Sequence, residues 1–396
     1  MDPTLDQSRT LFFQGVEHFE GGRLEQARST FEAALALAPG RPSVLGNLGI
    51  TLFHLGHPEQ AVPLLQQASA AAIPYAGAWN YLALAHESLA QWQPAVDALE
   101  RAGELAPGHA ALWFRKGQCL LRLGRVQEAL QAYDRALALA PDFADAWSAR
   151  GGLMRELHQL GEAANCFEKA LAFGGDPELN GYYLACVTGA TAVPPPPRRY
   201  VESLFDDYAA EFQNHVVGQL GYQGHESLLR PLISAGRRFH RALDLGCGTG
   251  LCAQLIHPLV DVLDGIDISQ GMLEQARQLG IYRALTHADI GSFLETAEGG
   301  ADLVVAADVF IYVGDLAAIF QSIRRVLAPD GRFAFTVEAP AGDEDLQLLP
   351  SLRYAHSERY IRRLANASGF TVDEIFRAPI RYDQAQAVEG LYVYLR

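Results

Sequence analysis

The sequence predicts two domains of different class, an all-α solenoid followed by an α/β domain with a Rossmann-like seven-stranded sheet. Three observations support this prediction. Small and aromatic residues recur every 34 residues through the first half. In the second half, a glycine-rich turn at Gly246–Gly250 stands between an apolar strand and an apolar helix. The prolines Pro194–Pro197 separate the two halves. We expect a solenoid over 1–190, a proline-rich linker over 191–199 and an α/β domain over 200–396.

The composition limits the class of protein. Hydrophobic residues make up 49% of the 396 residues, and the net charge of −15 opposes binding to nucleic acid or to an anionic membrane. The five cysteines are odd in number and lack metal-site spacing, so we expect no metal and a reducing compartment. No signal-peptide core and no apolar run of ~18 residues is found. These features predict a cytoplasmic protein without a membrane partner.

The first half is a periodic array. One position of the period holds Ala27, Ala61, Ala95, Ala129 and Ala163. Another holds Gly15, Gly49, Ala83, Gly117 and Gly151, and a third holds Phe31, Leu65, Leu99, Tyr133 and Phe167. Small residues permit two helices to cross closely, and large residues fill the space beside the crossing. The pattern resembles five tetratricopeptide repeats (TPRs) over 8–177, with a capping helix after them.

The resemblance to TPRs implies a protein or peptide ligand in the groove lined by the first helix of each repeat. The expected groove positions near the N-terminus are apolar, and they include Phe12, Phe19 and Phe53. We therefore expect an apolar or extended peptide, or self-association, at that end of the array. The alternative is that these aromatic side chains only pack between helices.

The pattern of Leu243–Gly250 is typical of a strand, a tight turn and a helix. Glycine permits positive φ and a close approach of a ligand to the backbone, and the start of a helix offers N–H groups. An ordinary turn and a dinucleotide-binding turn are alternatives, although Leu251 stands where the dinucleotide motif has its third glycine. The spacing of the three glycines after Asp244 resembles motif I of class I S-adenosylmethionine (AdoMet) methyltransferases.

This resemblance implies a site for AdoMet, with S-adenosylhomocysteine as the product. Asp267 ends the next strand, about 20 residues past the glycines, where a carboxylate accepts ribose hydroxyls. By resemblance, Ile268 and Met272 pack against the adenine, and Asp289 accepts from its amino group. The cofactor residues implied are Asp244, Gly246, Cys247, Gly248, Asp267, Ile268, Met272, Asp289, Ile290 and Asp308.

The candidate catalytic residues come from three places in the chain. Tyr208 belongs to an F-D-x-Y-A-x-x-F pattern that looks like the lid helix of small-molecule methyltransferases. Tyr312 and Asp308 follow the expected fourth strand, which adjoins the glycine turn. His356 lies in the expected loop after the fifth strand. If a base is needed, His356 is the first candidate, followed by Tyr208 or Tyr312. Each side chain has packing as its alternative role.

Nearly the whole chain resembles bacterial predicted methyltransferases that contain TPRs. The N-P-P-[YF] signature of amide and exocyclic-amine methylation is absent after the fourth strand. We expect O-, N- or C-methyl transfer by in-line displacement to a small-molecule or carrier-bound acceptor, with the repeats recruiting a substrate or partner. Two alternatives stay open. One is methylation of a free metabolite with the repeats used for oligomerisation, and the other is an AdoMet-binding TPR adaptor without catalysis.

Overall fold

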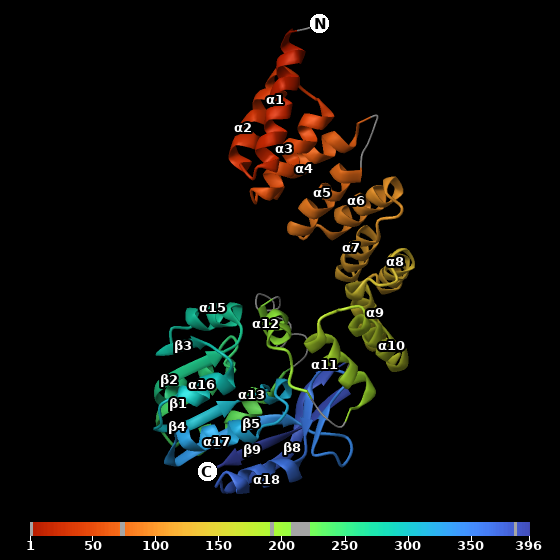
Figure 1. Cartoon of the computed structure of the whole chain (residues 1–396). Helices are drawn as coiled ribbons and strands as arrows, with labels where there is room; N and C mark the ends of the chain where they lie inside the picture. Colours follow the sequence, from red (N-terminus) through yellow and green to blue (C-terminus); the bar gives the residue numbers. More distant parts are fainter. Residues whose placement is uncertain (1–2, 72–75, 191–193, 207–221, 384–385) are drawn as a thin grey trace. The chain divides into compact units, whose positions relative to one another are not determined.

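The computed structural model describes residues 3–71, 76–190, 194–206, 222–383 and 386–396. The contacts within the chain divide it into two compact units, Met1–Gly175 and Asp176–Arg396. Figure 1 shows a first unit made of helices and a second unit built on a β-sheet. The predicted succession of an all-α solenoid and an α/β domain is confirmed.

The first unit is a series of helix pairs, one pair for each repeat. The described residues place α1 (Pro3–Glu20) with α2 (Leu24–Leu37), α3 (Pro42–His54) with α4 (Pro58–Ser69), α5 (Ala76–Ser88) with α6 (Trp92–Leu105), α7 (Ala110–Arg122) with α8 (Val126–Leu139), and α9 (Ala144–Glu156) with α10 (Leu160–Ala172). Pro42 and Pro58 lie in the first turn of their helices, where a missing N–H costs no hydrogen bond.

Small residues stand where the two helices of a pair meet. A Cβ atom added to Gly15 would lie 2.5 Å from the Phe31 ring, and one added to Gly151 would lie 2.7 Å from the Phe167 ring. Both rings are buried. Because real Cβ atoms do not approach so closely, these two positions require glycine. The pairing of small with large residues therefore explains the 34-residue period.

Helix α11 (Pro177–Thr188), which we expected to cap the repeats, groups with the second unit. Asp176 caps this helix, since its side chain accepts from two backbone N–H groups of the first turn. The Tyr182 hydroxyl donates to the Leu352 carbonyl at 2.8 Å, and the Cys186 thiol donates to the Leu349 carbonyl at 3.1 Å. The boundary between the two contact units therefore precedes α11.

The second unit is a sheet with helices on both faces. Its strands are β1 (Phe239–Leu245), β2 (Val260–Asp267), β3 (Ala284–His287), β4 (Ala301–Ala306), β5 (Leu327–Glu338), β6 (Leu346–Leu348), β7 (Tyr354–His356), β8 (Val372–Asp383) and β9 (Gln386–Leu395). Its further helices are α12 (Arg198–Asp206), α13 (Gly224–Ser234), α14 (Leu251–Ile256), η2 (His257–Leu259), α15 (Gln270–Gln278), α16 (Ile290–Thr296), η3 (Phe310–Tyr312), α17 (Ala317–Val326) and α18 (Glu358–Ala367).

The strand order explains where a ligand can lie. Strands β3, β2, β1, β4 and β5 are neighbours in that order and run parallel, and β9 pairs antiparallel with both β5 and β8. From β1 the chain adds β2 and β3 on one side, and it then crosses from β3 to β4 on the other side of β1. Such a switch point is where α/β sheets bind ligands. The hairpin of β6 and β7, which the sequence analysis did not predict, joins β5 through the pair Glu338 and Ala355.

Alternating side chains fill the two layers between sheet and helices. On β5, Phe333 and Phe335 pack with apolar residues of α16, α17 and α18. Ala334 points the other way and packs with residues of α13 and α14. Burial on both faces anchors the strands, so their carboxyl ends hold the following loops in fixed positions.

Candidate functional site

The glycine loop joins β1 to α14 and is the centre of the candidate site. Gly246, Gly248 and Gly250 have φ values of +64°, +53° and +90°, which side chains rarely tolerate. A Cβ atom on Gly246 would collide with Val309, and one on Gly250 would lie 2.5 Å from Leu279. At Gly248, no atom of the described residues lies within 4 Å of the added atom. Packing therefore explains two of the glycines, while the third leaves the backbone open to a ligand.

Asp267, at the end of β2, holds this loop in place. Its carboxylate accepts from the Gly248 N–H at 2.7 Å and from the Ser269 N–H at 2.9 Å. Burial raises the pKa of Asp267, while these backbone donors oppose the shift. The backbone of Ile268 also donates to this carboxylate, which still has lone-pair capacity for a hydroxyl donor. Its position supports the predicted role toward a ribose.

Asp244, on β1, lies beneath the glycine loop and is almost fully buried. The Tyr282 hydroxyl donates to its carboxylate at 2.7 Å. Burial and the nearby charge of Asp267 raise the pKa of Asp244 to about 7, although the Tyr282 phenol opposes the shift. The sequence analysis missed Tyr282. Its place two residues before β3 was the only signal, since the family motifs do not include it.

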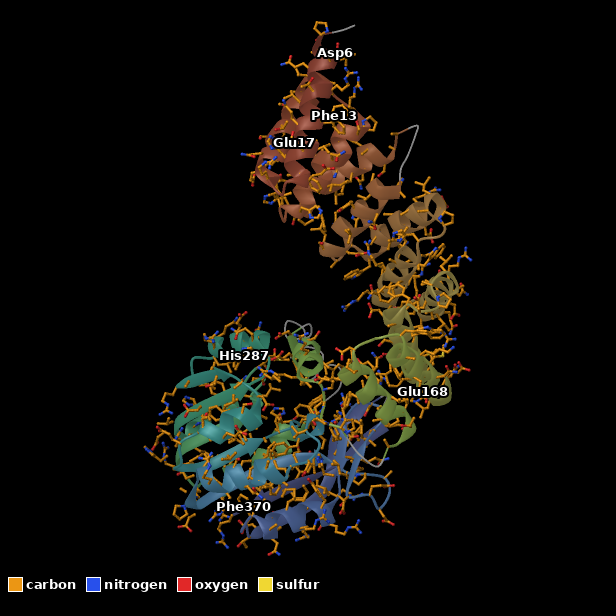
Figure 2. The ribbon with its side chains drawn as sticks, in the orientation of Figure 1. Asp6, Phe13, Glu17, Glu168, His287 and Phe370 are labelled. Carbon is orange, nitrogen blue, oxygen red and sulfur yellow. The ribbon has the colours of Figure 1, made fainter. Side chains whose placement is uncertain are left out.

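The predicted adenine-side residues gather at the starts of α15 and α16. Met272 is buried in α15, and Ile290 is buried at the first position of α16. The Asp289 carboxylate caps α16 by accepting from the Ser292 N–H at 3.0 Å. Ile268 presents its carbonyl to the His287 Nε2 at 2.7 Å, and Figure 2 labels this histidine. These contacts give Asp289 a structural role that leaves its second oxygen available for an amine.

Helix α12 connects the two ends of the candidate site. The Asp206 carboxylate accepts from the Ser269 hydroxyl at 2.6 Å and from the Gly271 N–H at 3.1 Å, at the start of α15. The ring of Phe205 lies 5.0 Å from that of Tyr312, edge to face. The helix thus contacts α15, and its Phe205 contacts η3. Tyr208, the lid tyrosine of the prediction, lies outside the described residues.

Charged residues meet at the ends of β4 and β5. Asp308 has a φ of +57°, and its N–H donates to the Thr336 hydroxyl at 2.8 Å. Arg381, which is buried, donates to Asp308 at 3.0 Å and also pairs with Glu338. The sequence analysis predicted Asp308 but missed Arg381 and Glu338. Glu338 directly follows the run 333–337 of β5, whereas β8 carries several charged residues, so no local pattern singled out Arg381.

Tyr312 and Arg353 complete this end of the site. Burial disfavours the charged form of Arg353 and lowers the pKa of its guanidinium. Tyr312, Asp308 and Glu338 outweigh burial, so the pKa is raised, and the contact with the Tyr312 phenol is among the causes. Arg353 immediately precedes β7, so the unpredicted hairpin is what brings it here.

His356 is placed differently from the loop position that we expected. It lies on β7 and is fully buried, with its Nε2 2.8 Å from the Gly314 carbonyl. Burial lowers the pKa of His356 to about 4, so the imidazole is neutral at pH 7 and its Nε2–H donates to that carbonyl. The ring stacks on Tyr360 at 5.7 Å. A neutral, enclosed imidazole of this kind fixes the position of a loop, and we do not carry it forward as a base.

In the repeat array, the aromatic residues at the N-terminal end form a row. The rings of Phe19 and Tyr81 lie 5.4 and 5.5 Å from that of His54, and the Phe53 ring lies 5.9 Å from Tyr81. Phe19, Phe53 and Tyr81 are partly buried and contact the core of the array, whereas His54 is exposed. Both the groove role and the packing role are therefore compatible with their positions.

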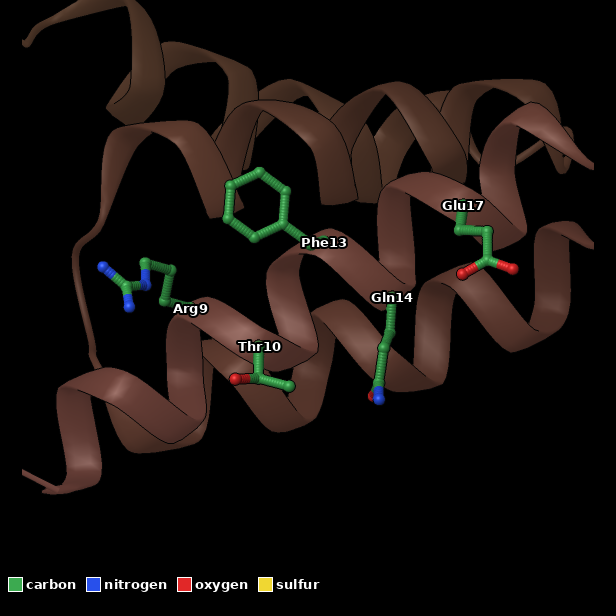
Figure 3. Close-up of a pocket in the computed structure, with 5 residues that line it drawn as sticks. All are labelled: Arg9, Thr10, Phe13, Gln14 and Glu17. Carbon is green, nitrogen blue, oxygen red and sulfur yellow. The ribbon is translucent and has the colours of Figure 1, made fainter.

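Helix α1 also carries an exposed aromatic side chain. Phe13 is 62% exposed, and together with Arg9, Thr10, Gln14 and Glu17 it lines a surface pocket (Figure 3).

Within the described residues, no cluster of three or more metal-binding side chains occurs. No helix in the same part of the chain has the length and apolarity needed to cross a membrane.

Comparison with known proteins agrees with this geometry. A family model for a methyltransferase domain matches residues 243–335, and models for tetratricopeptide repeats match 18–76 and 110–143. The chain is 34% identical over 129 residues to a malonyl-[acyl-carrier protein] O-methyltransferase of Legionella pneumophila, covering 31% of this chain and 45% of that protein. It is also 34% identical over 124 residues to the human protein named arginine-hydroxylase NDUFAF5, mitochondrial, covering 31% and 35%.

The match thus spans less than half the length of either relative. Among solved structures, a crystal structure of MamA is 24% identical and aligns with a TM-score of 0.41, over 42% of this chain and 92% of that one.

Proposed function

Because the chain carries tetratricopeptide repeats and a methyltransferase domain, we propose that it transfers a methyl group from AdoMet to an acceptor that the repeats recruit. The observation that carries the proposal is the glycine loop. Among the described residues, nothing fills the space on the Cβ side of Gly248, and its N–H is fixed by the buried carboxylate of Asp267. A ligand can therefore approach the backbone beside an acceptor suited to ribose hydroxyls.

The residues present fit AdoMet. Asp267 would accept from the ribose, and Asp244 would accept from the ammonium group of the methionine part. Thr249 in the same loop has a buried hydroxyl that lacks a hydrogen-bond partner in the described part of the chain. A polar ligand would satisfy this hydroxyl, whose burial is otherwise costly. When bound, AdoMet supplies a methyl group that its positive sulfur has already activated.

The protein's own contribution is orientation and exclusion of water. Helix α12 spans from α15 to η3, so it lies between the adenine side and the acceptor side. Holding two reactants in line is worth ~7–11 kcal/mol at best. The acceptor would enter at the ends of β4 and β5, where Asp308 and Tyr312 lie.

We further propose that the methyl acceptor is attached to a protein or to a carrier. The Legionella relative is named for an acyl-carrier protein, which is a protein-borne acceptor. The aromatic row around His54 and the exposed Phe13 give the repeats apolar surface for such a partner. The open alternatives are a free metabolite, with repeats used for oligomerisation, and a non-catalytic adaptor.

Calorimetric titration of the full chain with AdoMet, with NAD in parallel, tests the proposal. We expect AdoMet to bind and NAD not to bind. Binding of NAD alone would contradict the proposal and favour a dinucleotide enzyme. Mass spectrometry of any product then separates methyl transfer, a gain of one methylene, from hydroxylation, a gain of one oxygen.

The role of the repeats needs a second experiment. We would compare transfer to malonyl-[acyl-carrier protein] with transfer to malonyl-pantetheine, in wild type, Tyr81→Ala and Phe173→Ala. Tyr81 belongs to the aromatic row, while Phe173 is an exposed control at the end of α10. Recruitment predicts that only Tyr81→Ala slows transfer to the protein-borne probe. Equal rates in all three proteins would favour oligomerisation.

A further inference from the structure

Two arginines converge where β4 and β5 end, and they are used differently. Arg381 divides its guanidinium between Asp308 and Glu338, and its Nε has no partner among the described residues. Arg353 immediately precedes β7, whose Ala355 pairs with Glu338, and the charges of Tyr312, Asp308 and Glu338 raise the pKa of its guanidinium against the effect of burial. Arg353 forms no ion pair within the part of the chain that the structure describes. One guanidinium is thus occupied, and the other is held close by without a carboxylate partner.

The backbone fixes Arg353 in this position. Leu352, the residue before it, has a φ of +63°, a conformation that costs a branched side chain free energy. The Leu352 carbonyl accepts from the Tyr182 hydroxyl at 2.8 Å, and the Arg353 carbonyl accepts from the Leu349 N–H at 2.8 Å. These bonds maintain a strained turn whose effect is to direct Arg353. Strain maintained in this way is typical of functional sites.

The charges around Arg353 keep it cationic without using its donors. Asp308 and Glu338 offset the two arginines, but the ion pair that each of them forms is with Arg381. Arg353 therefore retains N–H groups in the fork arrangement that matches a carboxylate.

The same ion pairs occupy the nearby carboxylates. Asp308 and Glu338 are each bound to Arg381, and His356 is fully buried in protein. Hydroxyl and carbon acceptors need a base in the transition state, whereas a carboxylate is already ionised at pH 7. The described residues at this end of the site are therefore better suited to an acceptor that needs no deprotonation.

We propose that the methyl acceptor is a carboxylic acid and that Arg353, with Tyr312, binds its carboxylate. This inference rests on the proposed function and adds the acceptor class. A carboxylate oxygen uses a lone pair to form the bond to the methyl carbon, while the carbon–sulfur bond breaks and its electron pair goes to sulfur. The products are a methyl ester and S-adenosylhomocysteine, and no proton is released.

The first test is binding, with malonate as the anionic probe and malonamide as its uncharged match. Both are titrated into the full chain saturated with S-adenosylhomocysteine. We expect malonate to bind more tightly than malonamide, and Arg353→Ala to weaken malonate at least about tenfold. Arg353→Lys keeps the charge but loses the fork, so its affinity for malonate should lie between those of the wild type and Arg353→Ala. Arg363→Ala is the control, because Arg363 is exposed and paired with Asp345.

Two results would overturn this assignment. Equal binding of malonate and malonamide to the wild type would remove the case for an anion site. Weaker binding of S-adenosylhomocysteine by Arg353→Ala would show that Arg353 holds the cofactor's own carboxylate. Thermal melting confirms that each variant is folded.

The second test identifies the class of product. The protein is incubated with malonyl-[acyl-carrier protein] and AdoMet labelled in the methyl group, and the product is treated with mild base. A methyl ester releases labelled methanol, whereas N-methyl and ether products do not. We expect volatile label that Arg353→Ala reduces at least about tenfold. A base-stable methylated product would overturn the carboxylate acceptor and leave the methyltransferase standing, while failure to bind AdoMet would contradict the proposed function itself.

Discussion

Glycines serve different purposes in the two units of this chain. In the repeats, Gly15 and Gly151 stand against buried rings, so the protein's own packing excludes a side chain. In the loop after β1, Gly248 stands against nothing that the structure describes, yet Asp267 fixes its N–H. The first kind of glycine serves the fold, and the second leaves room for a ligand. Substitutions should therefore damage stability in one place and binding in the other.

The largest effect is expected at the carboxylate that fixes the ligand-facing glycine. Asp267→Ala removes the acceptor of two backbone N–H groups and of the ribose. We expect a loss of S-adenosylhomocysteine affinity of about a hundredfold, since each lost charged hydrogen bond costs about 1.5–3 kcal/mol. Asp261→Ala is the control, because Asp261 is an exposed acid on the same strand. Similar affinities in both variants would show that Asp267 is structural only.

A second prediction separates two adjacent glycines of α9. Alanine is the better helix former by about 1 kcal/mol, so Gly152→Ala, with no atom within 4 Å of its added Cβ, should raise the unfolding midpoint. Gly151→Ala places its Cβ against Phe167, and overpacking of about 1–3 kcal/mol should lower the midpoint. Circular dichroism melts measure both. A higher midpoint for Gly151→Ala would disprove the steric explanation of the repeat.

The third prediction concerns pH and Asp244. Its pKa is raised to about 7 in the folded chain, first by burial, and it is near 4 when unfolded. The folded state therefore binds more protons between pH 4 and 7, so this carboxyl makes the ligand-free protein less stable as pH rises through that window. Asp244→Asn should abolish that dependence in denaturant titrations.

Ligand binding should show the opposite trend. Only the ionised Asp244 is a full acceptor for an ammonium group, so S-adenosylhomocysteine affinity should fall about five- to sixfold from pH 7 to pH 6. The affinity of Asp244→Asn should be lower and flat across this range. A wild-type affinity that does not change with pH would mean that Asp244 does not face the ligand.

The smallest effect is expected at α12. Asp206→Ala removes the contact with Ser269 and Gly271, which is worth about 1 kcal/mol, so ligand affinity should fall about fivefold. Glu202→Ala, which loses only the pair with Arg198 on the same helix, should bind as the wild type does. Equal affinity in both variants would show that α12 does not cover the ligand.

The sequence analysis predicted the fold because periodic patterns are local. The 34-residue period and the alternation in the strands each follow from one helix crossing or one sheet face. The hairpin of β6 and β7 escaped prediction because each strand has three residues, too few to show alternation. His356 was consequently expected in a loop, although it is a buried strand residue.

The two ends of the candidate site also differ in how far the sequence predicted their residues. Gly248 and Asp267 belong to motifs that a single stretch of sequence displays. Arg381 and Arg353 reach the site only because β8 and β7 fold back toward β5, contacts that no local pattern reveals. Tyr282 was missed for the same reason, since its partner Asp244 lies on another strand.

The central claim, that Gly248 faces a bound AdoMet, is tested most directly by two arginine substitutions. Gly248 and Gly236 share a positive φ, +53° and +64°, and no atom of the part of the chain that the structure describes lies within 4 Å of a Cβ added to either. The backbone strain of Gly248→Arg and Gly236→Arg is therefore similar. Titration with S-adenosylhomocysteine should show binding by Gly236→Arg and none by Gly248→Arg. Equal binding by both variants would contradict the placement of the site.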